Sequence, residues 1–174
     1  MKLNEWAELS YLFKPLDVPA MTMLLEEGQV SRAMFFIEKG CLRTWINNDG
    51  KEITTQFFFE GDTVSSIESF RTNKPSLYSI ETIEPCQLQT ISQEDFQDAL
   101  ENVPGLKKKL EDRLFRRLFQ AQEILYSFLK SNPQKRYEEL VARYPHLVQR
   151  VPQHYIASYL GITSVSLSRI RNRR

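Results

Sequence analysis

The stretch PQHYIASYLGITSVSLSRIRNRR, residues 152–174, closes the chain and decides how this end of it folds. Four of its last six residues are arginines, and it contains no aspartate or glutamate. Pro152 suits the first turn of a helix, where a backbone N–H is not needed. Gly161 is the residue type that best tolerates the left-handed conformation that ends a helix, and Thr163 can cap a second helix. The stretch therefore predicts two short helices joined by a glycine turn.

Apolar spacing indicates which faces of these two helices are buried. Tyr155, Ile156, Tyr159 and Leu160 repeat with a helical period, and Leu167 and Ile170 of the second helix lie three residues apart. This arrangement is typical of a helix-turn-helix, whose second helix reads the major groove of DNA. The residues expected to face outward on that helix are Ser164, Val165, Ser168, Arg169, Arg171 and Asn172, with Arg173 beside them.

The outward residues carry groups that recognise DNA. Arginine binds guanine bidentately, and serine bonds to bases or phosphates. We predict a base contact for Arg169 and phosphate contacts for Arg171, Arg173 and Arg150. The alternative is a helical hairpin that merely packs, which leaves the acid-free outer face unexplained. The full predicted DNA-binding set is Arg169, Ser164, Val165, Ser168, Ser166, Thr163, Arg171, Arg173, Arg150, and Gln153 and His154 at a helix N-terminus that favours phosphate.

Charge is distributed unevenly along the 174 residues, although the net charge is only +1. Residues 1–99 hold 16 acidic side chains against 8 basic ones, whereas residues 143–174 hold 6 basic side chains and no acidic one. A basic end on an acidic body predicts a polyanionic partner for the end, which the helix-turn-helix pattern identifies as double-stranded DNA, and a different role for the body. A merely solvated basic tail is the alternative, and composition alone does not exclude it.

Composition also bounds the class of protein. No run approaches eighteen apolar residues, and the N-terminus lacks the pattern of a signal peptide, so we expect a cytoplasmic protein without a membrane partner. Cys41 and Cys86 belong to no CxxC or Cys/His cluster. We therefore expect no metal and no cofactor.

The acidic body has the pattern of β-structure. Glycines recur every ten to twelve residues from Gly28 to Gly61, and the segments between them are rich in aromatic and β-branched residues. Residues 47–50, Asn-Asn-Asp-Gly, predict a hairpin turn. Short strands at this spacing favour a sandwich or barrel over a parallel sheet.

Residues 104–130 carry the strongest helical pattern in the chain. The apolar face is wider than one small sheet needs, so we favour a coiled-coil-like homodimer seam over purely internal burial. Ser131, Asn132 and Pro133 are expected to end this helix and to start another from Gln134 to about Tyr144. The predicted dimer interface is Leu106, Leu110, Leu114, Leu118, Ala121, Leu125 and Phe128.

The order of these parts resembles the Crp/Fnr superfamily of bacterial transcription regulators. The amino-acid sequence of the matching stretches is most similar to the Bacteroidota subgroup of that superfamily. The resemblance covers nearly the whole chain. It implies an α+β fold: a double-stranded β-helix (jelly roll), a long dimerisation helix and a C-terminal helix-turn-helix. It also implies a homodimer that binds a palindromic DNA site. The stretches that carry the resemblance are IASYLGITSVSLSRIR, FFIEKGCLRTW, NNDGKEIT and FFEGDTVSS.

On this resemblance we expect three parts: a cyclic-nucleotide-binding-like sensor over residues 1–100, a dimerisation helix over 101–131, and a DNA-binding domain over 132–174. Members that bind cyclic nucleotides carry a Gly-Glu pair for the ribose and an Arg-Ser or Arg-Thr pair whose arginine neutralises the phosphate. In this chain those positions align with Ser65-Ser66 and with Ser76-Leu77. A buried cyclic phosphate without a cation would be uncompensated, so we expect a degenerate pocket that does not bind cAMP or cGMP tightly.

Three classes of function remain to be compared. The first is a dimeric DNA-binding regulator that senses an unidentified small molecule or none. The second is a metal-dependent enzyme on the same roll, which we disfavour because His146 and His154 both lie outside it. The third is a nucleotide-like sensor or interaction module whose helical end docks protein. DNA binding that weakens steeply with salt would separate the first class from the third.

Overall fold

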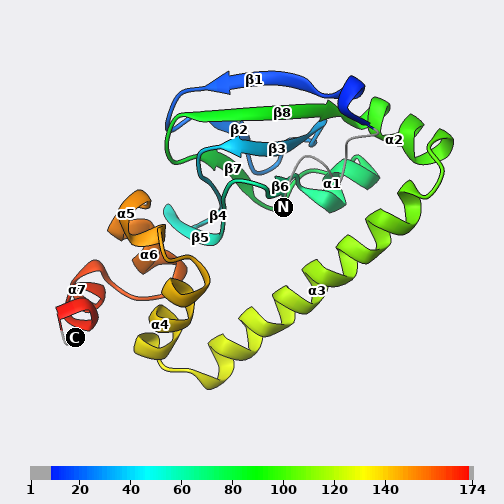
Figure 1. The fold of residues 1–174 in the computed structure, drawn as a ribbon. Helices are drawn as coiled ribbons and strands as arrows, with labels where there is room; N and C mark the ends of the chain where they lie inside the picture. The colour runs from blue at the N-terminus through cyan, green and yellow to red at the C-terminus, as the bar shows by residue number, and fades with distance from the viewer. Residues whose placement is uncertain (1–8, 173–174) are drawn as a thin grey trace. The chain divides into compact units, whose positions relative to one another are not determined.

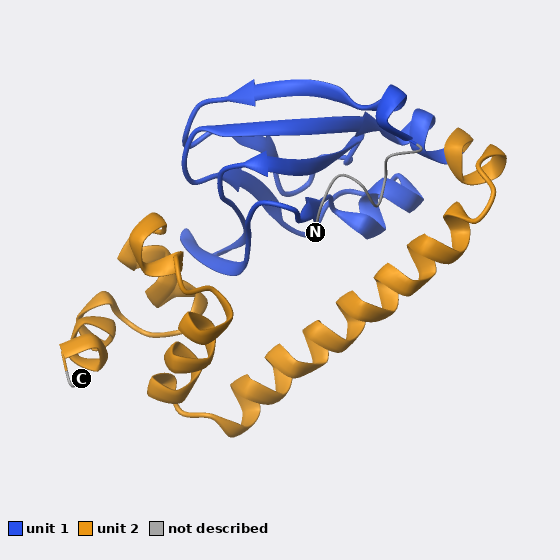
Figure 2. Cartoon of the chain, in the orientation of Figure 1, with its two compact units in different colours: residues 1–97 blue, residues 98–174 orange. Residues whose placement is uncertain are grey.

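The computed structural model describes residues 9–172, which form two compact units that divide between Gln97 and Asp98 (Figures 1 and 2). The first unit holds the strands, and the second holds most of the helices. None of the helices in residues 9–172 is long and apolar enough to cross a membrane.

The first unit is a sandwich of two four-stranded antiparallel sheets, with the orders β1-β8-β3-β6 and β2-β7-β4-β5. Side chains from both sheets, such as Ile37 and Leu42, meet in one buried cluster. Together with the long helix and the closing helices, this architecture confirms the predicted fold class. The elements are β1 (Lys14–Val18), β2 (Met23–Leu25), β3 (Ala33–Lys39), β4 (Leu42–Asn48), β5 (Lys51–Phe58), β6 (Thr63–Val64), α1 (Ile67–Thr72), β7 (Ser79–Thr82) and β8 (Cys86–Ser92).

The β4–β5 hairpin turns where the sequence predicts it. Asp49 and Gly50 have φ values of 52° and 83°, so both central residues adopt the left-handed region that this tight turn requires. The Asn47 side chain accepts a hydrogen bond of 2.8 Å from the Gly50 N–H. This local chemistry sets the register of β4 against β5.

A buried arginine lies in the sheet that contains β4. Arg43 is only 1% exposed, and its Nε and Nη2 donate to Glu81 Oε2 at 2.9 and 2.6 Å. Nη2 also lies 2.5 Å from Glu52 Oε2. Arg43 and Glu81 are direct cross-strand partners on β4 and β7, and Glu81 is itself buried. The charge of each buried side chain is compensated only while its partner is present.

The second unit contains the long helix and four shorter ones. Ser92 caps α2, because its hydroxyl accepts the Asp95 N–H at 3.0 Å. Asn132 caps α4 in the same way, accepting the Lys135 N–H at 2.9 Å, and Pro133 opens that helix as expected. The helices are α2 (Gln93–Asn102), which spans the division, α3 (Leu106–Lys130), α4 (Pro133–Arg143), α5 (Leu147–Arg150), α6 (Gln153–Tyr159) and α7 (Ser164–Asn172).

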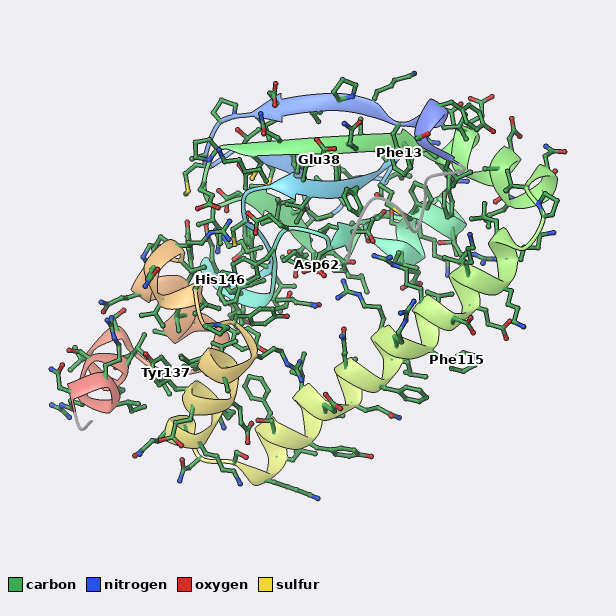
Figure 3. All side chains as sticks on the ribbon, in the orientation of Figure 1. Phe13, Glu38, Asp62, Phe115, Tyr137 and His146 are labelled. Carbon is green, nitrogen blue, oxygen red and sulfur yellow. The ribbon has the colours of Figure 1, made fainter. Side chains whose placement is uncertain are left out.

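Helix α3 has 25 residues and an apolar face that its own chain leaves largely uncovered. Leu118 and Leu125 are 51% and 56% exposed, and Leu114 and Ala121 are also exposed. A second exposed pair, Phe115 and Phe119, stacks with ring centroids 6.3 Å apart, and Figure 3 shows Phe115 projecting from the helix.

Two ends of the predicted seam depart from this pattern. Leu106 is fully buried within its own chain, so the prediction that it lies in a dimer seam is wrong. It is the first residue of α3 and follows a tight turn in which its N–H bonds to the Val103 carbonyl, which places it at the α2–α3 corner. Phe128 is exposed on one side, but its ring also packs edge-to-face on Tyr159, with centroids 6.2 Å apart. Leu110 is half-buried.

Candidate nucleic-acid interface

Helices α6 and α7 are joined by the glycine turn that the sequence predicts. Gly161 has a φ of 67°, and its N–H donates to the Ser158 carbonyl at 3.0 Å. The Ile162 N–H donates to the Ala157 carbonyl at 3.0 Å, which satisfies a second carbonyl at the end of α6. Thr163 then caps α7, because its hydroxyl accepts the Ser166 N–H at 3.1 Å.

A small apolar contact holds α7 on α6. Tyr155, Ile156 and Ala157 of α6 are buried, and so is Leu160 in the turn. Leu167 is the one fully buried residue of α7, with Ile170 half-buried beside it. One side of α7 therefore packs on α6, and the opposite side is exposed.

The free side of α7 carries the predicted recognition residues. Val165 is 61% exposed, and the residues around it are polar or basic. Successive helical positions are about 100° apart, so residues three or four positions apart lie on the same side of a helix. The exposed residues of α7 have this spacing or are direct neighbours, and they share one side. Arg171 is half-buried at the flank of this face. The face contains no acidic group, and its exposed members are Ser164, Val165, Ser168, Arg169 and Asn172.

The other predicted DNA-binding residues are placed differently. Thr163 and Ser166 use their hydroxyls on each other, 3.0 Å apart, in the cap of α7. Gln153 and His154 are exposed at the start of α6, whereas Arg150 is half-buried on α5. Arg173 lies outside the described residues.

In the first unit, the positions that align with the nucleotide-binding pairs form a network of serine hydroxyls. Ser65, Ser66 and Ser76 are all buried. Ser76 donates to Ser66 at 2.9 Å, and the hydroxyls of Ser65 and Ser31 lie 3.2 Å apart. Each hydroxyl is therefore satisfied by the protein itself.

Leu77, which the sequence also assigns to the predicted pocket, does not belong to this network. Its side chain is 71% exposed. The backbone of Ser76 is held on both sides, by the Gly28 N–H and the Gln29 carbonyl, each at 2.8 Å. The chain bends at Leu77 and Tyr78, and the Ser76 hydroxyl donates to the Tyr78 carbonyl across this bend at 2.6 Å. Tyr78, which the sequence did not indicate, donates its hydroxyl to the Ser65 carbonyl at 3.0 Å.

Within residues 9–172 the structure contains no group of three or more histidine, cysteine, aspartate or glutamate side chains placed to hold a metal ion.

Comparison with known proteins identifies the first unit. The family model of the cyclic nucleotide-binding domain matches residues 15–103, slightly more than half of the chain. Among curated proteins, the chain is 26% identical over 110 residues to the Pycsar effector protein XpPycTIR of Xanthomonas perforans. That match covers 63% of this chain, and the chain spans only 35% of the length of that relative.

Solved structures share the whole architecture. FixK2 from Bradyrhizobium japonicum superimposes with a TM-score of 0.80 at 13% identity, covering 92% of this chain and 83% of that one. The c-di-GMP responsive global regulator CLP of Xanthomonas campestris gives 0.74 at 15% identity, covering 99% and 91%. A protein from Eubacterium rectale described as a regulator of the Crp/Fnr family gives 0.75 at 15% identity, covering 99% and 83%. At these identities the likeness establishes the fold.

Proposed function

The chain belongs to the cyclic nucleotide-binding domain family, and from this premise we propose that it is a dimeric, sequence-specific DNA-binding transcription regulator of the Crp/Fnr type. The observation that carries the proposal is the exposed, acid-free face of α7, which presents Arg169 with serines and Val165 while Leu167 holds the helix on α6. Arginine and small hydroxyl side chains on an accessible helix match the donor and acceptor groups of the major groove.

The overall architecture supports the same proposal. The matched solved structures include proteins whose names describe global or transcriptional regulators, and they cover nearly all of this chain. We propose that residues 1–100 are the sensor-like domain, 101–131 the dimerisation helix and 132–174 the DNA-binding domain. We also propose membership of the Bacteroidota subgroup, a cytoplasmic location and no enzymatic activity.

The mechanism we propose depends on the spacing of two α7 helices. Two recognition helices in a dimer engage both half-sites when they lie about one DNA turn, roughly 34 Å, apart. The exposed face of α3 would hold the two chains together, and a change in the angle between α3 and α4 would move both α7 helices. A ligand shifts this balance only if it binds the competent spacing more tightly than the other.

The proposal is tested by selecting bound duplexes from a random DNA pool with the full chain. We expect a two-fold symmetric site with half-sites about one turn apart. The affinity for the selected duplex should fall steeply as salt is raised, because phosphate neutralisation releases counterions. Failure to enrich any duplex, or an affinity without a salt slope, would count against DNA recognition.

Arg169 should specify one base position. Arg169→Ala is expected to weaken binding to the selected duplex by about 1–3 kcal/mol and to relax preference at that position. Competition binding against a set of single-base variants measures both effects. Arg171→Ala is the matched control, because a phosphate contact should weaken binding equally on every sequence. If Arg169→Ala also acted equally on every sequence, Arg169 would be a phosphate contact.

Val165 should recognise the methyl group of a thymine. It is the one large apolar side chain exposed on the described part of α7, and an apolar contact with the thymine methyl discriminates that base in the major groove. Replacing that thymidine by deoxyuridine removes only the methyl group of the base. The affinity of the wild type should fall about three- to tenfold, because the contact is worth roughly the transfer free energy of one methylene group. The Val165→Ser variant should bind both duplexes equally. Equal binding of the two duplexes by the wild type would refute the contact.

The serine network of the first unit predicts that cyclic nucleotides bind weakly. Ser66 and Ser76 replace the expected glutamate and arginine, are buried and bond to each other, so a cyclic phosphate would find no cation at that position. Isothermal titration of the full chain with cAMP and with cGMP should show no binding at micromolar concentrations. Micromolar or tighter binding of either nucleotide would contradict this prediction and would mean that the serine network opens to admit the ligand.

A second candidate function is a sensor or interaction module whose helical end docks protein. The observation in its favour is the similarity to a Pycsar effector protein, which extends over 110 residues of this chain. The same duplex selection separates the two functions, since a protein-docking module would enrich no duplex.

A further inference from the structure

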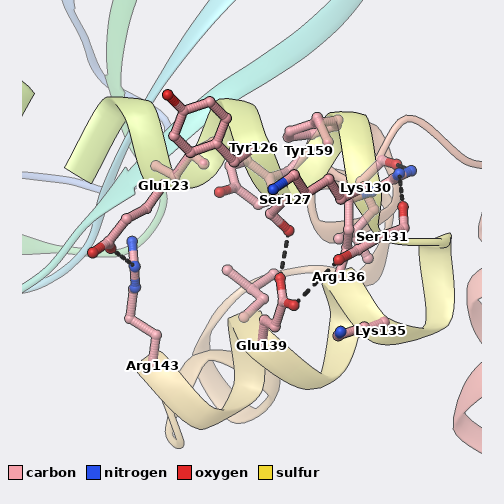
Figure 4. Close-up of a pocket in the computed structure, with 14 residues that line it drawn as sticks. Glu123, Tyr126, Ser127, Lys130, Ser131, Lys135, Arg136, Glu139, Arg143 and Tyr159 are labelled. Carbon is pink, nitrogen blue, oxygen red and sulfur yellow. Dashed lines mark hydrogen bonds and ion pairs between the residues drawn. The ribbon is translucent and has the colours of Figure 1, made fainter. Parts of the chain in front are cut away.

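A groove opens in the second unit, where α3, α4 and α6 meet (Figure 4). Its volume is about 450 Å³, within the range of roughly 300–1,000 Å³ that is usual for small-molecule sites. Its lining includes Ser131, one of the two residues that connect α3 to α4. A molecule bound there would touch both helices.

The groove has an apolar part formed by Ile124, Phe128 and Leu140, with Leu160 of the α6–α7 turn beside them. Tyr159 adds an aromatic wall and packs on Phe128. Burial, together with the neighbouring Tyr144, raises the pKa of Tyr159 above its usual value. The phenol is therefore neutral at physiological pH, and the wall suits a hydrocarbon or aromatic body.

The two acidic residues that line the groove already have partners. Glu139 accepts hydrogen bonds from the hydroxyls of Ser127 and Ser131, the latter at 3.3 Å (Figure 4). Glu123 forms an ion pair with Arg143 at 2.9 Å. The partners of Glu139 are neutral and it keeps its charge, but the four cations that line the groove still outnumber its two carboxylates.

Three cations of the groove have no carboxylate partner within residues 9–172. Arg136 donates to the neutral carbonyls of Ser131 and Leu160, both at 2.9 Å, and its guanidinium lies 4.8 Å from the centre of the Phe128 ring. Its Nε is buried without a hydrogen-bond partner among these residues. Lys130 lies over the Tyr126 ring at 5.6 Å, and Lys135 lines the groove without an ion pair. The groove therefore combines an apolar wall with an excess of positive charge.

We propose that this groove is a binding site for a small amphipathic anion, a molecule with an aromatic or aliphatic body and one acidic group. The body packs on Ile124, Phe128 and Tyr159, and the acidic group is neutralised by Lys130 and Lys135 with Arg136 behind them. Such a ligand bridges α3 and α4 and favours one angle between them. Its effect on DNA binding rests on the proposed function, whereas the site itself does not.

The site is tested with two dyes that share one body. The first, 8-anilino-1-naphthalenesulfonate, carries a sulfonate, and the second, N-phenyl-1-naphthylamine, is its neutral parent. Fluorescence titration of the full wild-type chain should show saturable binding of both dyes, with the sulfonate tighter. The Lys130→Gln/Lys135→Gln variant should bind the sulfonate about tenfold more weakly, as expected for two partly exposed charge contacts, and bind the neutral dye unchanged.

The matched control is Lys107→Gln/Lys108→Gln, which removes two charges from the exposed start of α3, outside the groove. It should leave both affinities unchanged. No saturable binding of the sulfonate to the wild type, or an equal loss in the two double variants, would overturn the proposal. These titrations contain no DNA, so their failure leaves the regulator proposal intact. If the DNA-binding proposal and the groove proposal both hold, adding the sulfonate dye should change the affinity of the wild type for its selected duplex. The affinity of the Lys130→Gln/Lys135→Gln variant for the same duplex should not change.

Discussion

Replacing Arg43 by methionine is expected to lower the free energy of unfolding by about 3–5 kcal/mol, because one buried charge would lose its partner. Methionine fills much of the arginine volume, but it leaves the Glu81 carboxylate, also buried, without the guanidinium that bonds it at 2.6 and 2.9 Å. Glu52 is half exposed and can be solvated, so the loss concerns Glu81. Urea denaturation followed by circular dichroism measures the change.

Two further variants make this result specific. The Arg43→Met/Glu81→Met double variant should recover most of the lost stability, because a buried ion pair replaced by apolar residues of similar size is close to neutral. Glu68→Gln breaks the exposed pair between Glu68 and Lys74, whose atoms lie 4.0 Å apart, and should leave the midpoint of unfolding unchanged. A double variant as unstable as Arg43→Met would mean that the arginine stabilises the sheet by its shape and not by its charge.

Placing a glutamate at Leu118 is expected to weaken association of two chains by about 3 kcal/mol or more, because each copy would bring an unpaired carboxylate into the seam. That energy corresponds to more than a hundredfold in the dimer dissociation constant. Leu118 lies midway along α3, and Leu114 and Leu125 on the same side are also exposed. Sedimentation equilibrium measures the constant, and binding to the selected duplex should fall with it.

The control for the seam is Gln120→Glu. Gln120 is also exposed, two positions along α3 and therefore on another side of the helix, so it adds the same charge outside the seam. It should leave the dimer unchanged. A dimer that tolerates Leu118→Glu as well would mean that other surfaces hold the two chains together, and the exposed leucines would need another partner.

Local signals in the sequence predicted much of the fold. The hairpin at Asn47–Gly50, the break at Asn132–Pro133 and the turn at Gly161 each depend on backbone preferences of a few neighbouring residues, and the structure has all three. The outward face of α7 followed from the spacing of Leu167 and Ile170 in the same way. These features need no knowledge of distant parts of the chain.

Contacts between distant residues were not predictable from one sequence. Arg43 and Glu81 are 38 positions apart, and nothing in either neighbourhood indicates their pairing. The partners of Glu139 lie outside its own helix, Ser127 on α3 and Ser131 in the connection between α3 and α4, so the groove was not predictable either. Leu106 has the same residue type and period as Leu110 and Leu114, yet it is fully buried at the turn before α3. Periodicity shows which face of a helix is apolar, but not what covers it.

The single uninterrupted helix from Leu106 to Lys130 restricts how this protein can vary in length. Inserting one residue into its middle would turn everything after it by about 100° around the helix axis and carry it about 1.5 Å further. Leu114 and Leu125 would then face different directions. Seven inserted residues restore the direction to within about 20°. Natural insertions and deletions in this segment should therefore occur in sevens, while the loops of the first unit vary freely.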